Sequence, residues 1–592
     1  MQTVYIIDVK SGNLQSLSNA IKHIGGYEIV FITNAEEFQQ YDSQIERLLF
    51  PGVGNYAHFV KQLHDRALVE PIRAYIESGR ALMGICVGLQ SLFRDSEECS
   101  DGVQGLGYLD LSLYKFNKED PIFQERGLIK SVPHIGWNSV SEIRKSGELL
   151  DENESLFSIN TTNKYYFVHS YAAILKTQEI KDKIAQYASQ GWDFVYANYG
   201  SEQFLAAVSY KNFFATQFHP EKSGVAGLKV LKSFLEGSKY DVVSAHDIQK
   251  PVNGQTVEKT LGGLTRRIIA CLDVRTNDDG DLVVTKGDQY NVREASSSDS
   301  EESKVRNLGK PVELATRYYR QGADEVTFLN ITSFRNSPLQ DLPMLQVLSK
   351  AAESIFVPLT VGGGIKDMED PVTKKRVPAV QVADLYFRSG ADKVSIGSDA
   401  VNIAEKYYAN GGKGDGTSSI ETISATFGNQ AVVISVDPKR KYVSSPEDTT
   451  QEVIQIIDPA KYGPNGEQYC YYQVTSQGGR KTHELGALEL CVACEKLGAG
   501  EVLLNSIDHD GSNKGYNLEL LNQVKSRVSI PVIASSGAGN PAHFQEVFEM
   551  DCGIDAALGA GLFHRNEYAV NDVKRFLQSQ KMDVRLDDKV EL

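Results

Sequence analysis

The chain lacks most features that mark membrane, secreted and nucleic-acid-binding proteins. No apolar stretch in its 592 residues is long enough to cross a bilayer. The first residues form a short strand-like run with no basic segment before it, so we expect no signal peptide. Only seven cysteines occur and they are scattered, which is no disulfide framework and predicts a reduced, cytoplasmic setting.

Basic charge is also scarce, because 61 Lys and Arg face 77 Asp and Glu for a net charge of −16. This balance argues against nucleic acid as a partner, although local sites can still bind a small anion. Cys491 and Cys494 form a lone CxxC without a nearby histidine cluster, so helix packing is a better interpretation than zinc. We therefore expect no metal, no cofactor and small-molecule substrates.

The chain is too long for one hydrophobic core, and its pattern changes partway along. Strand-like runs at 4–8 and 48–50 alternate with helical spacing at 13–24, which predicts a mostly parallel sheet with helices on both faces. This first domain is expected to end near Gly237. Residues 238–263 are polar and aperiodic, which predicts a linker before a second domain over 264–592.

The second domain repeats a strand-and-helix alternation eight times, the number that a (β/α)8 barrel needs. The expected strands are 268–274, 325–330, 356–361, 393–396, 431–436, 501–505, 531–534 and 556–558. The barrel also repeats itself, since Cys271-Leu-Asp273-Val is echoed by Ser435-Val-Asp437-Pro and Gly322-Ala-Asp-Glu-Val326 by Gly498-Ala-Gly-Glu-Val502. We therefore predict two half-barrel repeats, with insertions at 291–305, 367–378, 408–419 and 441–470.

A cysteine between two glycines is the main chemical motif of the first domain. Gly84-Ile-Cys86-Val-Gly88 follows an apolar run, as in the cysteine form of a nucleophile elbow. His219 could deprotonate the thiol and Glu221 could orient the imidazole. Gly52 and Val53, in a glycine-rich turn, could join the Val87 N–H in stabilising an oxyanion. The pattern predicts attack on an acyl or amide carbon.

These residues resemble the class I glutamine amidotransferase family over roughly the first 235 residues. The resemblance implies that Cys86, His219 and Glu221 form the triad that splits glutamine into glutamate and ammonia. It also implies an oxyanion loop at Gly52 and Val53, and glutamine-binding positions at Gln90, Ser170 and Tyr171.

Two aspartates and several glycine loops follow the barrel strands. Asp273 and Asp437 end the first and fifth strands, which lie opposite one another, so the carboxylates suit general acid/base work on one substrate. Glycine-rich loops follow the third, fourth, seventh and eighth strands and can bind anions through backbone N–H groups. The duplicated loops predict a long substrate with two phosphates, bound by Gly363, Gly364, Gly397, Ser398, Ser536, Gly537, Ala560 and Gly561.

The barrel resembles the cyclase of the imidazole glycerol phosphate synthase family of histidine biosynthesis. The resemblance rests on Arg267-Ile-Ile-Ala-Cys-Leu-Asp-Val274, Thr360-Val-Gly-Gly-Gly364, Asp508-His-Asp-Gly-Ser512 and Ala534-Ser-Ser-Gly-Ala-Gly539. It implies that Asp273 and Asp437 are the acid/base pair and that Lys286, Asn505, Asp510, Gly511 and Ser512 contact substrate. Gly397 and Gly561 depart from the bacterial pattern, which usually has Asn and Ser there.

Together the two halves are similar to the fused fungal or plant enzyme. The resemblance implies that glutamine supplies ammonia to N′-[(5′-phosphoribulosyl)formimino]-5-aminoimidazole-4-carboxamide ribonucleotide, hereafter the formimino ribonucleotide. The products would be imidazole glycerol phosphate and aminoimidazole carboxamide ribonucleotide. Because both catalytic parts share one chain, we expect a monomer.

Ammonia transfer requires an enclosed route, so the first domain should dock on the N-terminal face of the barrel. Arg267 precedes the first barrel strand and could gate the entrance, a role that the resemblance supports. Lys222 follows Glu221, and Asp392 lies just before the fourth barrel strand. We predict that this lysine and aspartate pair across the interface, the alternative being two solvated surface charges.

Three other interpretations are open at this point. A pyridoxal-phosphate-type synthase also pairs a glutaminase with a barrel, but it needs Schiff-base lysines where this barrel has aspartates. A sugar isomerase related to the histidine pathway would need no glutaminase. A non-enzymatic scaffold is disfavoured by the intact set of Cys86, His219, Glu221, Asp273 and Asp437.

Overall fold

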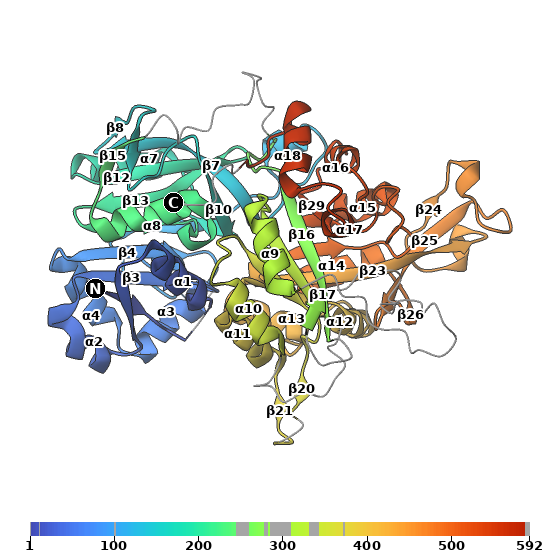
Figure 1. Ribbon diagram of the computed structural model, residues 1–592, viewed down its shortest axis with the longest axis horizontal. Coiled ribbons are helices and arrows are strands. Elements are labelled where there is room, and N and C mark those ends of the chain that lie inside the picture. The colour runs from blue at the N-terminus through green and yellow to red at the C-terminus, as the bar shows by residue number, and fades with distance from the viewer. Residues whose placement is uncertain are drawn as a thin grey trace.

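The computed structural model describes residues 2–10, 12–99, 102–243, 260–276, 282–284, 310–330, 343–370 and 373–586. They form an N-terminal unit and a barrel that lie against each other, blue to green and lime to red in Figure 1. Lys286, the insertion at 291–305 and residues 244–259 of the expected linker lie outside the described residues.

A ten-stranded sheet forms the centre of the N-terminal unit, in the order β10-β7-β12-β13-β14-β4-β3-β1-β2 with β8 on the edge of β7. The half from β14 to β2 is parallel, as predicted, and the half from β10 to β13 is antiparallel, which the sequence pattern did not predict. The strands are β1 (Gln2–Ile7), β2 (Tyr27–Ile32), β3 (Arg47–Gly52), β4 (Ala81–Cys86), β7 (His134–Lys145), β8 (Glu148–Leu149), β10 (Lys164–His169), β12 (Asp193–Tyr199), β13 (Glu202–Tyr210) and β14 (Phe213–Thr216).

Helices and two small sheets complete this unit. The helices are α1 (Leu14–Ile24), α2 (Ala35–Tyr41), α3 (Tyr56–Asp65), α4 (Val69–Glu77), α5 (Val87–Gln90), α6 (Pro121–Gln124), α7 (Gln178–Ser189) and α8 (Gly224–Glu236). One small sheet joins β5 (Phe93–Ser96), β6 (Leu109–Lys115) and β11 (Tyr171–Ala172), and the other joins β9 (Glu154–Leu156) to β15 (Tyr240–Val242).

Strand β15 changes the expected end of the first domain. Helix α8 ends at Gly237, which has the left-handed conformation of a helix cap at φ 78°. The chain then continues into β15, which pairs antiparallel with β9 and adds three more residues to the N-terminal unit. Residues 240–242 are therefore a strand and not linker, because β9 offers them backbone hydrogen bonds that composition alone does not reveal.

Eight parallel strands close into the barrel, in the order β22-β19-β18-β16-β29-β28-β27-β23 with β22 also pairing with β23. They are β16 (Arg267–Thr276), β18 (Glu325–Asn330), β19 (Leu359–Gly362), β22 (Lys393–Ile396), β23 (Val432–Val443), β27 (Glu501–Leu504), β28 (Val532–Ala534) and β29 (Ala556–Gly559). All eight predicted strands are confirmed. β19 starts three residues later than expected because Pro358, which has no backbone N–H, precedes it.

The barrel helices are α9 (Pro311–Arg320), α10 (Pro343–Ala351), α11 (Ala379–Arg388), α12 (Ser398–Ala409), α13 (Ser419–Phe427), α14 (Ala487–Leu497), α15 (Leu518–Lys525), α16 (Pro541–Phe548), α17 (Gly561–His564) and α18 (Val570–Ser579). Cys491 and Cys494 are buried within α14. No helix of the described residues combines the length and apolar character that crossing a membrane requires.

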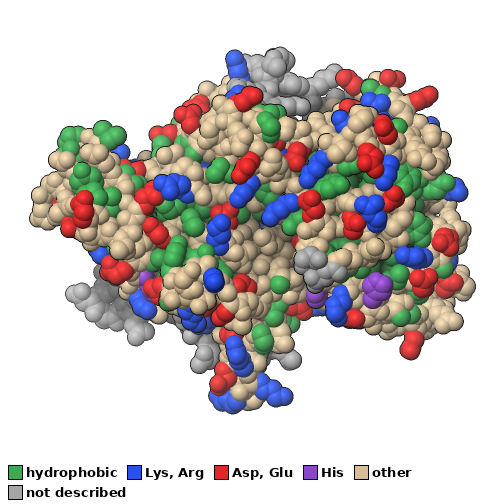
Figure 2. All heavy atoms as spheres, turned by 180° about the vertical axis from the view of Figure 1, so that it is seen from behind, with side chains coloured by type: hydrophobic (Ala, Val, Ile, Leu, Met, Phe, Trp, Pro, Cys, Tyr) green, Lys and Arg blue, Asp and Glu red, His purple; other side chains and the backbone are tan. Residues whose placement is uncertain are grey.

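Two of the expected insertions form β-structure. Strands β20 (Met368–Glu369) and β21 (Arg376–Val377) make a hairpin that projects from the body and carries side chains of both charges (Figure 2). β23 continues past the barrel and pairs with β25 (Tyr469–Ser476), which also pairs with β24 (Ile454–Gln455) and β26 (Lys481–Gly486). Strand β17 (Leu282–Val284) pairs with the end of β16.

The N-terminal unit docks on the N-terminal ends of the barrel strands, as predicted. The Trp137 indole donates to the carbonyl of Asp324, which precedes β18, and the Val132 N–H donates to the carbonyl of Ser529, which precedes β28. The Gly224 N–H likewise donates to the Phe356 carbonyl before β19. The face opposite the strand ends that carry the two aspartates is therefore covered.

Candidate functional site

Cys86 lies at a sharp turn between β4 and α5. Its φ of 53° and ψ of −108° are unusual for a residue with a side chain. Such strain is typical of a nucleophile elbow, where the turn holds the reactive atom at the strand end. The motif inferred from the sequence therefore has the expected local geometry.

The glycines around Cys86 are required by close backbone contacts. A Cβ on Gly88 would lie 1.9 Å from the Phe50 carbonyl oxygen, and one on Gly52 would lie 2.5 Å from the Gly88 nitrogen. Gly52 is paired with Cys86 in the sheet register. The loop expected to bind the oxyanion is thus packed directly against the nucleophile turn.

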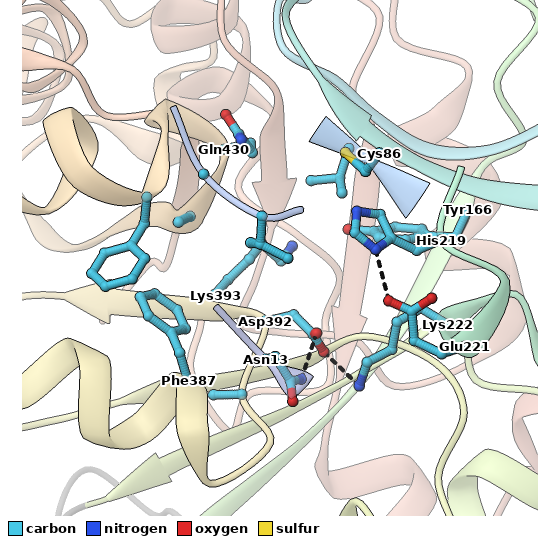
Figure 3. A pocket seen from close by; sticks show the side chains of 16 residues that line it. Asn13, Cys86, Tyr166, His219, Glu221, Lys222, Phe387, Asp392, Lys393 and Gln430 are labelled. Atoms are coloured by element: carbon cyan, nitrogen blue, oxygen red, sulfur yellow. Dashed lines mark hydrogen bonds and ion pairs between the residues drawn. The ribbon is translucent and has the colours of Figure 1, made fainter. Parts of the chain in front are cut away.

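His219 connects Cys86 to Glu221. The Nδ1 of His219 lies 2.8 Å from Oε1 of Glu221, and its ring lies beside the Cys86 sulfur in Figure 3. Burial alone lowers the pKa of His219, but Cys86 and Glu221 outweigh that effect and raise the pKa well above its usual value. The arrangement favours a protonated imidazole beside the Cys86 sulfur.

The predicted glutamine-binding residue Gln90 is connected to the cysteine through Gln217. Gln90 donates through Nε2 to the Tyr171 carbonyl at 3.0 Å and to Oε1 of Gln217 at 3.2 Å. The Nε2 of Gln217 in turn lies 3.6 Å from the Cys86 sulfur. Ser170 accepts a backbone bond from Phe116 and so fixes the same loop.

A small cavity lies between the two units and connects the Cys86 site to the bottom of the barrel. Its walls include Cys86 and His219 from the N-terminal unit and Asp392, Lys393 and Gln430 from the barrel (Figure 3). Its volume of about 40 Å³ can hold a few molecules of the size of water or ammonia. The sulfur and the bottom of the barrel thus line one cavity.

Lys222 and Asp392 form an ion pair at the edge of this cavity. Lys222 Nζ lies 2.7 Å from Asp392 Oδ2, and the lysine side chain is only 2% exposed. Asn13 donates to Asp392 Oδ1 at 2.9 Å, and the Leu359 N–H donates to Oδ2 at 2.8 Å. These burial and hydrogen-bond data do not fit two solvated surface charges.

Four buried charged side chains close the bottom of the barrel. Arg267 contacts Glu325 at 3.2 Å and also contacts Glu501, while Lys393 lies 2.8 Å from Glu325 and 2.6 Å from Glu501. Although burial raises the pKa of Glu501, Arg267 and Lys393 hold it below its usual value. The charges of the two cations and two anions cancel. We call Arg267, Glu325, Lys393 and Glu501 the charged ring.

Above the charged ring most of the described inward side chains are apolar, and they form a separate buried cluster of Ile269, Cys271, Val433, Leu503, Ile533, Ala556 and Leu558. Thr327 and Ser395, in register with Cys271 and Val433, add two buried hydroxyl groups. Burial raises the pKa of Cys271 well above its usual value, so it is a neutral thiol there. Such a lining favours passage of neutral ammonia over ammonium, because an ion loses its hydration.

Asp273 and Asp437 lie at the far end of this interior and differ in their surroundings. Burial, followed by the charges of Asp510 and Asp437, raises the pKa of Asp273 to about 7. Burial also raises the pKa of Asp437, but the Asn505 amide donates to its Oδ1 at 2.6 Å and opposes that shift. Near neutral pH Asp273 can therefore hold a proton, while the hydrogen bond from Asn505 favours the ionised form of Asp437.

The predicted phosphate loops surround this mouth. Gly363 and Gly364 have φ values of 100° and 75°, and Gly537 has a φ of 99°. Ser536 adopts a φ of 75° despite its side chain. A Cβ on Gly537 would lie 2.1 Å from the Gly515 carbonyl oxygen, so the loop after β28 packs tightly on the loop that contains Asp510, Gly511 and Ser512.

Sequence reasoning missed Gln217 and Asn13, and it missed three of the four residues of the charged ring. A signal for two of those three was present, because Glu325 and Glu501 occupy matching positions in the internal repeat. Both begin a strand with an inward-facing charge. Gln217 and Asn13 carry no such pattern, since their partners come from distant parts of the chain.

Comparison with known proteins matches both units. Residues 5–237 match the family model described as glutamine amidotransferase class-I, and residues 267–569 match the one described as histidine biosynthesis protein. The imidazole glycerol phosphate synthase hisHF of Emericella nidulans is 51% identical over 99% of both chains. The hisHF of Schizosaccharomyces pombe is 51% identical over 98% of this chain and 99% of its own. The subunit HisF of Methanobrevibacter smithii is 37% identical over its whole length and 55% of this chain.

Proposed function

The chain belongs to the fused imidazole glycerol phosphate synthase family, and from that premise we propose how its residues divide the work. It is a single-chain enzyme of histidine biosynthesis that hydrolyses glutamine, channels ammonia and forms imidazole glycerol phosphate. The isomerase, pyridoxal-phosphate-type synthase and scaffold interpretations therefore fall away.

In the first step the Cys86 sulfur attacks the amide carbon of glutamine. The Val87 N–H and the turn at Gly52 and Val53 stabilise the oxyanion. His219 gives its proton to the departing ammonia, and Glu221 keeps the imidazole oriented. Water then hydrolyses the thioester and releases glutamate. Gln90, Ser170 and Tyr171 hold the glutamine in place.

Ammonia leaves through the cavity that Cys86 and Lys393 share, and this shared cavity is the observation that carries the proposal. Lys393 belongs to the charged ring, so the route from the sulfur leads directly to the bottom of the barrel. Rearrangement around Arg267 opens the ring, and the apolar interior keeps ammonia neutral. Lys222 and Asp392 hold the two units in register over this path.

In the barrel, ammonia attacks the formimino ribonucleotide between the two aspartates. We assign Asp273 as the general acid, because its pKa of about 7 keeps a proton available. Asp437 is the general base, since Asn505 supports its ionised form. The reaction closes the imidazole ring and releases aminoimidazole carboxamide ribonucleotide.

The two phosphates of this substrate bind at opposite sides of the mouth. One lies at the loops of Gly363, Gly364, Gly397 and Ser398, and the other at Ser536, Gly537, Ala560 and Gly561. Asp510, Gly511 and Ser512 contact the middle of the substrate, and Lys286 belongs to the same set. We also propose a monomeric enzyme of the cytoplasm, with a glutaminase domain over 1–237, extended by β15, and a cyclase domain over 264–592.

Replacing the nucleophile tests this division. Cys86→Ala should abolish product formation from glutamine and leave synthesis from added ammonium salts near the wild-type rate, because the two sites use separate residues. Steady-state rates with each nitrogen source measure this, and Cys99→Ala is a matched control that should alter neither rate. Equal loss of both activities in a folded Cys86→Ala protein would refute the proposal.

A further inference from the structure

One glycine at the mouth of the barrel has its side-chain space filled by an arginine. A Cβ on Gly561 would lie 2.7 Å from Nη1 of Arg565. Gly561 begins α17 and Arg565 is the C-cap residue that follows its last residue, so the two are four positions apart and lie on one face of that turn. Gly561 is not among the glycines with positive φ. Backbone conformation therefore does not require a glycine here, and the guanidinium occupies the space that a side chain at this position would enter.

The guanidinium is held in one orientation by two neighbours. Arg565 Nε lies 2.7 Å from Oε1 of Glu567, and its Nη2 lies 2.9 Å from Oε2 of the same carboxylate. Nη2 also donates to Oδ1 of Asn513 at 3.1 Å. A side chain that is fixed in this way loses less rotamer entropy when it binds a ligand.

Asn513 connects this arginine to the substrate loops. It directly follows Ser512, and a Cβ on Gly539 would lie 2.5 Å from its carbonyl oxygen. The loops after β27, β28 and β29 therefore meet where Arg565 lies. The arginine side chain is only 26% exposed, in contrast to the 54% of Arg527 elsewhere on the barrel.

We propose that Arg565 binds a phosphate monoester group of the substrate, together with the loops around Gly537 and Gly561. This inference rests on the proposed function and adds to it a cation that selects for charge at one end of the substrate. A guanidinium matches the geometry of phosphate oxygens, and Nη1 lies 2.7 Å from the place that a Cβ on Gly561 would occupy. At the other end of the mouth, the nearest atoms to a Cβ on Gly397 are 3.8 Å away and belong to Ser435. The two phosphates thus meet different surroundings.

The first test is the Michaelis constant for the formimino ribonucleotide, with ammonium salts as the nitrogen source. Arg565→Met should raise this KM about 10- to 100-fold, the range of one hydrogen bond to a charged group, while kcat changes little. Arg565→Lys should lie between Met and the wild type. Arg527→Met, a matched change of an exposed arginine, should leave KM unchanged.

The second test uses the contact itself. Gly561→Ser should displace the guanidinium and raise KM by a similar factor, although the charge is still present. In the double variant Gly561→Ser with Arg565→Met, the two effects should not multiply, because both remove one interaction. Independent effects would mean that the glycine and the arginine act separately.

An unchanged KM in Arg565→Met would overturn this inference while leaving the cyclase assignment intact. Absence of cyclisation by the wild type with ammonium salts would instead overturn the proposed function. If Arg565→Met does not fold, Gly561→Ser and Arg565→Lys decide, since a normal KM in both would exclude the arginine as a phosphate ligand.

Discussion

Replacing Asp273 with Asn should disable the cyclase and stabilise the fold at the same time. The amide cannot transfer a proton, so cyclisation with either nitrogen source should fall about 10²- to 10⁴-fold. A damaged fold would lose activity and stability together. A lower cyclisation rate together with a higher free energy of unfolding would identify Asp273 as a group that is retained for catalysis although it destabilises the fold.

The size of the stability gain follows from the surroundings of Asp273. Its pKa is about 7 against an ordinary value of 3.8, and each unit corresponds to about 1.36 kcal/mol, which gives an upper limit of about 4 kcal/mol. Because the side chain still partly reaches solvent, we expect about 2 kcal/mol. The raised pKa means that the folded protein keeps a proton that the unfolded chain releases. Stability is therefore lost as pH rises from about 4 to about 7, and the gain from Asn should be full above pH 7.

Thermal or urea unfolding at pH 5 and pH 8, together with initial rates from ammonium salts, measures both effects. Asp551→Asn, a change of an exposed aspartate on the same domain, should alter neither rate nor stability. A folded Asp273→Asn enzyme that cyclises at near the wild-type rate would refute the acid/base role. A variant that loses stability at pH 8 would refute the electrostatic reasoning.

Three further variants address the interface. Asp392→Ala should weaken stimulation of glutamine hydrolysis by the cyclase substrate while ammonia-dependent cyclisation survives, with exposed Glu353→Ala as its control; full stimulation and a normal ratio of glutamate to product would remove the ion pair from signalling. Lys393→Met leaves Glu325 and Glu501 with one cation fewer, so it should lower the free energy of unfolding by about 3–5 kcal/mol. The variant should also release glutamate in excess of product, and a one-to-one ratio of glutamate to product would contradict the role of the charged ring as a gate. Gly54→Ala would place a Cβ 2.7 Å from the Thr426 carbonyl oxygen at a backbone φ of 111°. The glutamine-dependent rate should therefore fall about tenfold while the ammonia-dependent rate stays normal. Equal losses of both rates would count against an effect that is confined to the interface.

Local chemistry explains why much of the architecture could be predicted. The eight barrel strands follow from apolar runs that alternate with amphipathic helices, and the Cys86 turn follows from two glycines that only a tight elbow requires. The antiparallel half of the first sheet was missed in part because β7 pairs with β10 and β12, which lie farther along the chain. The hairpins from β12 to β13 and from β13 to β14 have two-residue turns, which are a local signal that the sequence reasoning did not use. β15 was missed because residues 240–242 are exposed and pair with β9, which lies far away in the sequence.

The site could be predicted in part. Each catalytic residue lies in a motif of its own, but the contacts between motifs are a property of the tertiary structure. The inward direction of Glu325, Lys393 and Glu501 depends on barrel closure, and the space above Gly561 depends on the rotamer of Arg565. The sequence shows that Gly561 departs from the bacterial serine, whereas the position of the Arg565 guanidinium beside it is a property of the tertiary structure.

The central claim is that ammonia released at Cys86 reaches the aspartates without entering bulk water. The most direct measurement supplies glutamine labelled with ¹⁵N in the amide, together with excess unlabelled ammonium, and determines the ¹⁵N content of the imidazole glycerol phosphate. We predict that nearly all of the incorporated nitrogen carries the label. Dilution of the label to the level of the ammonium pool would contradict the enclosed route through the charged ring.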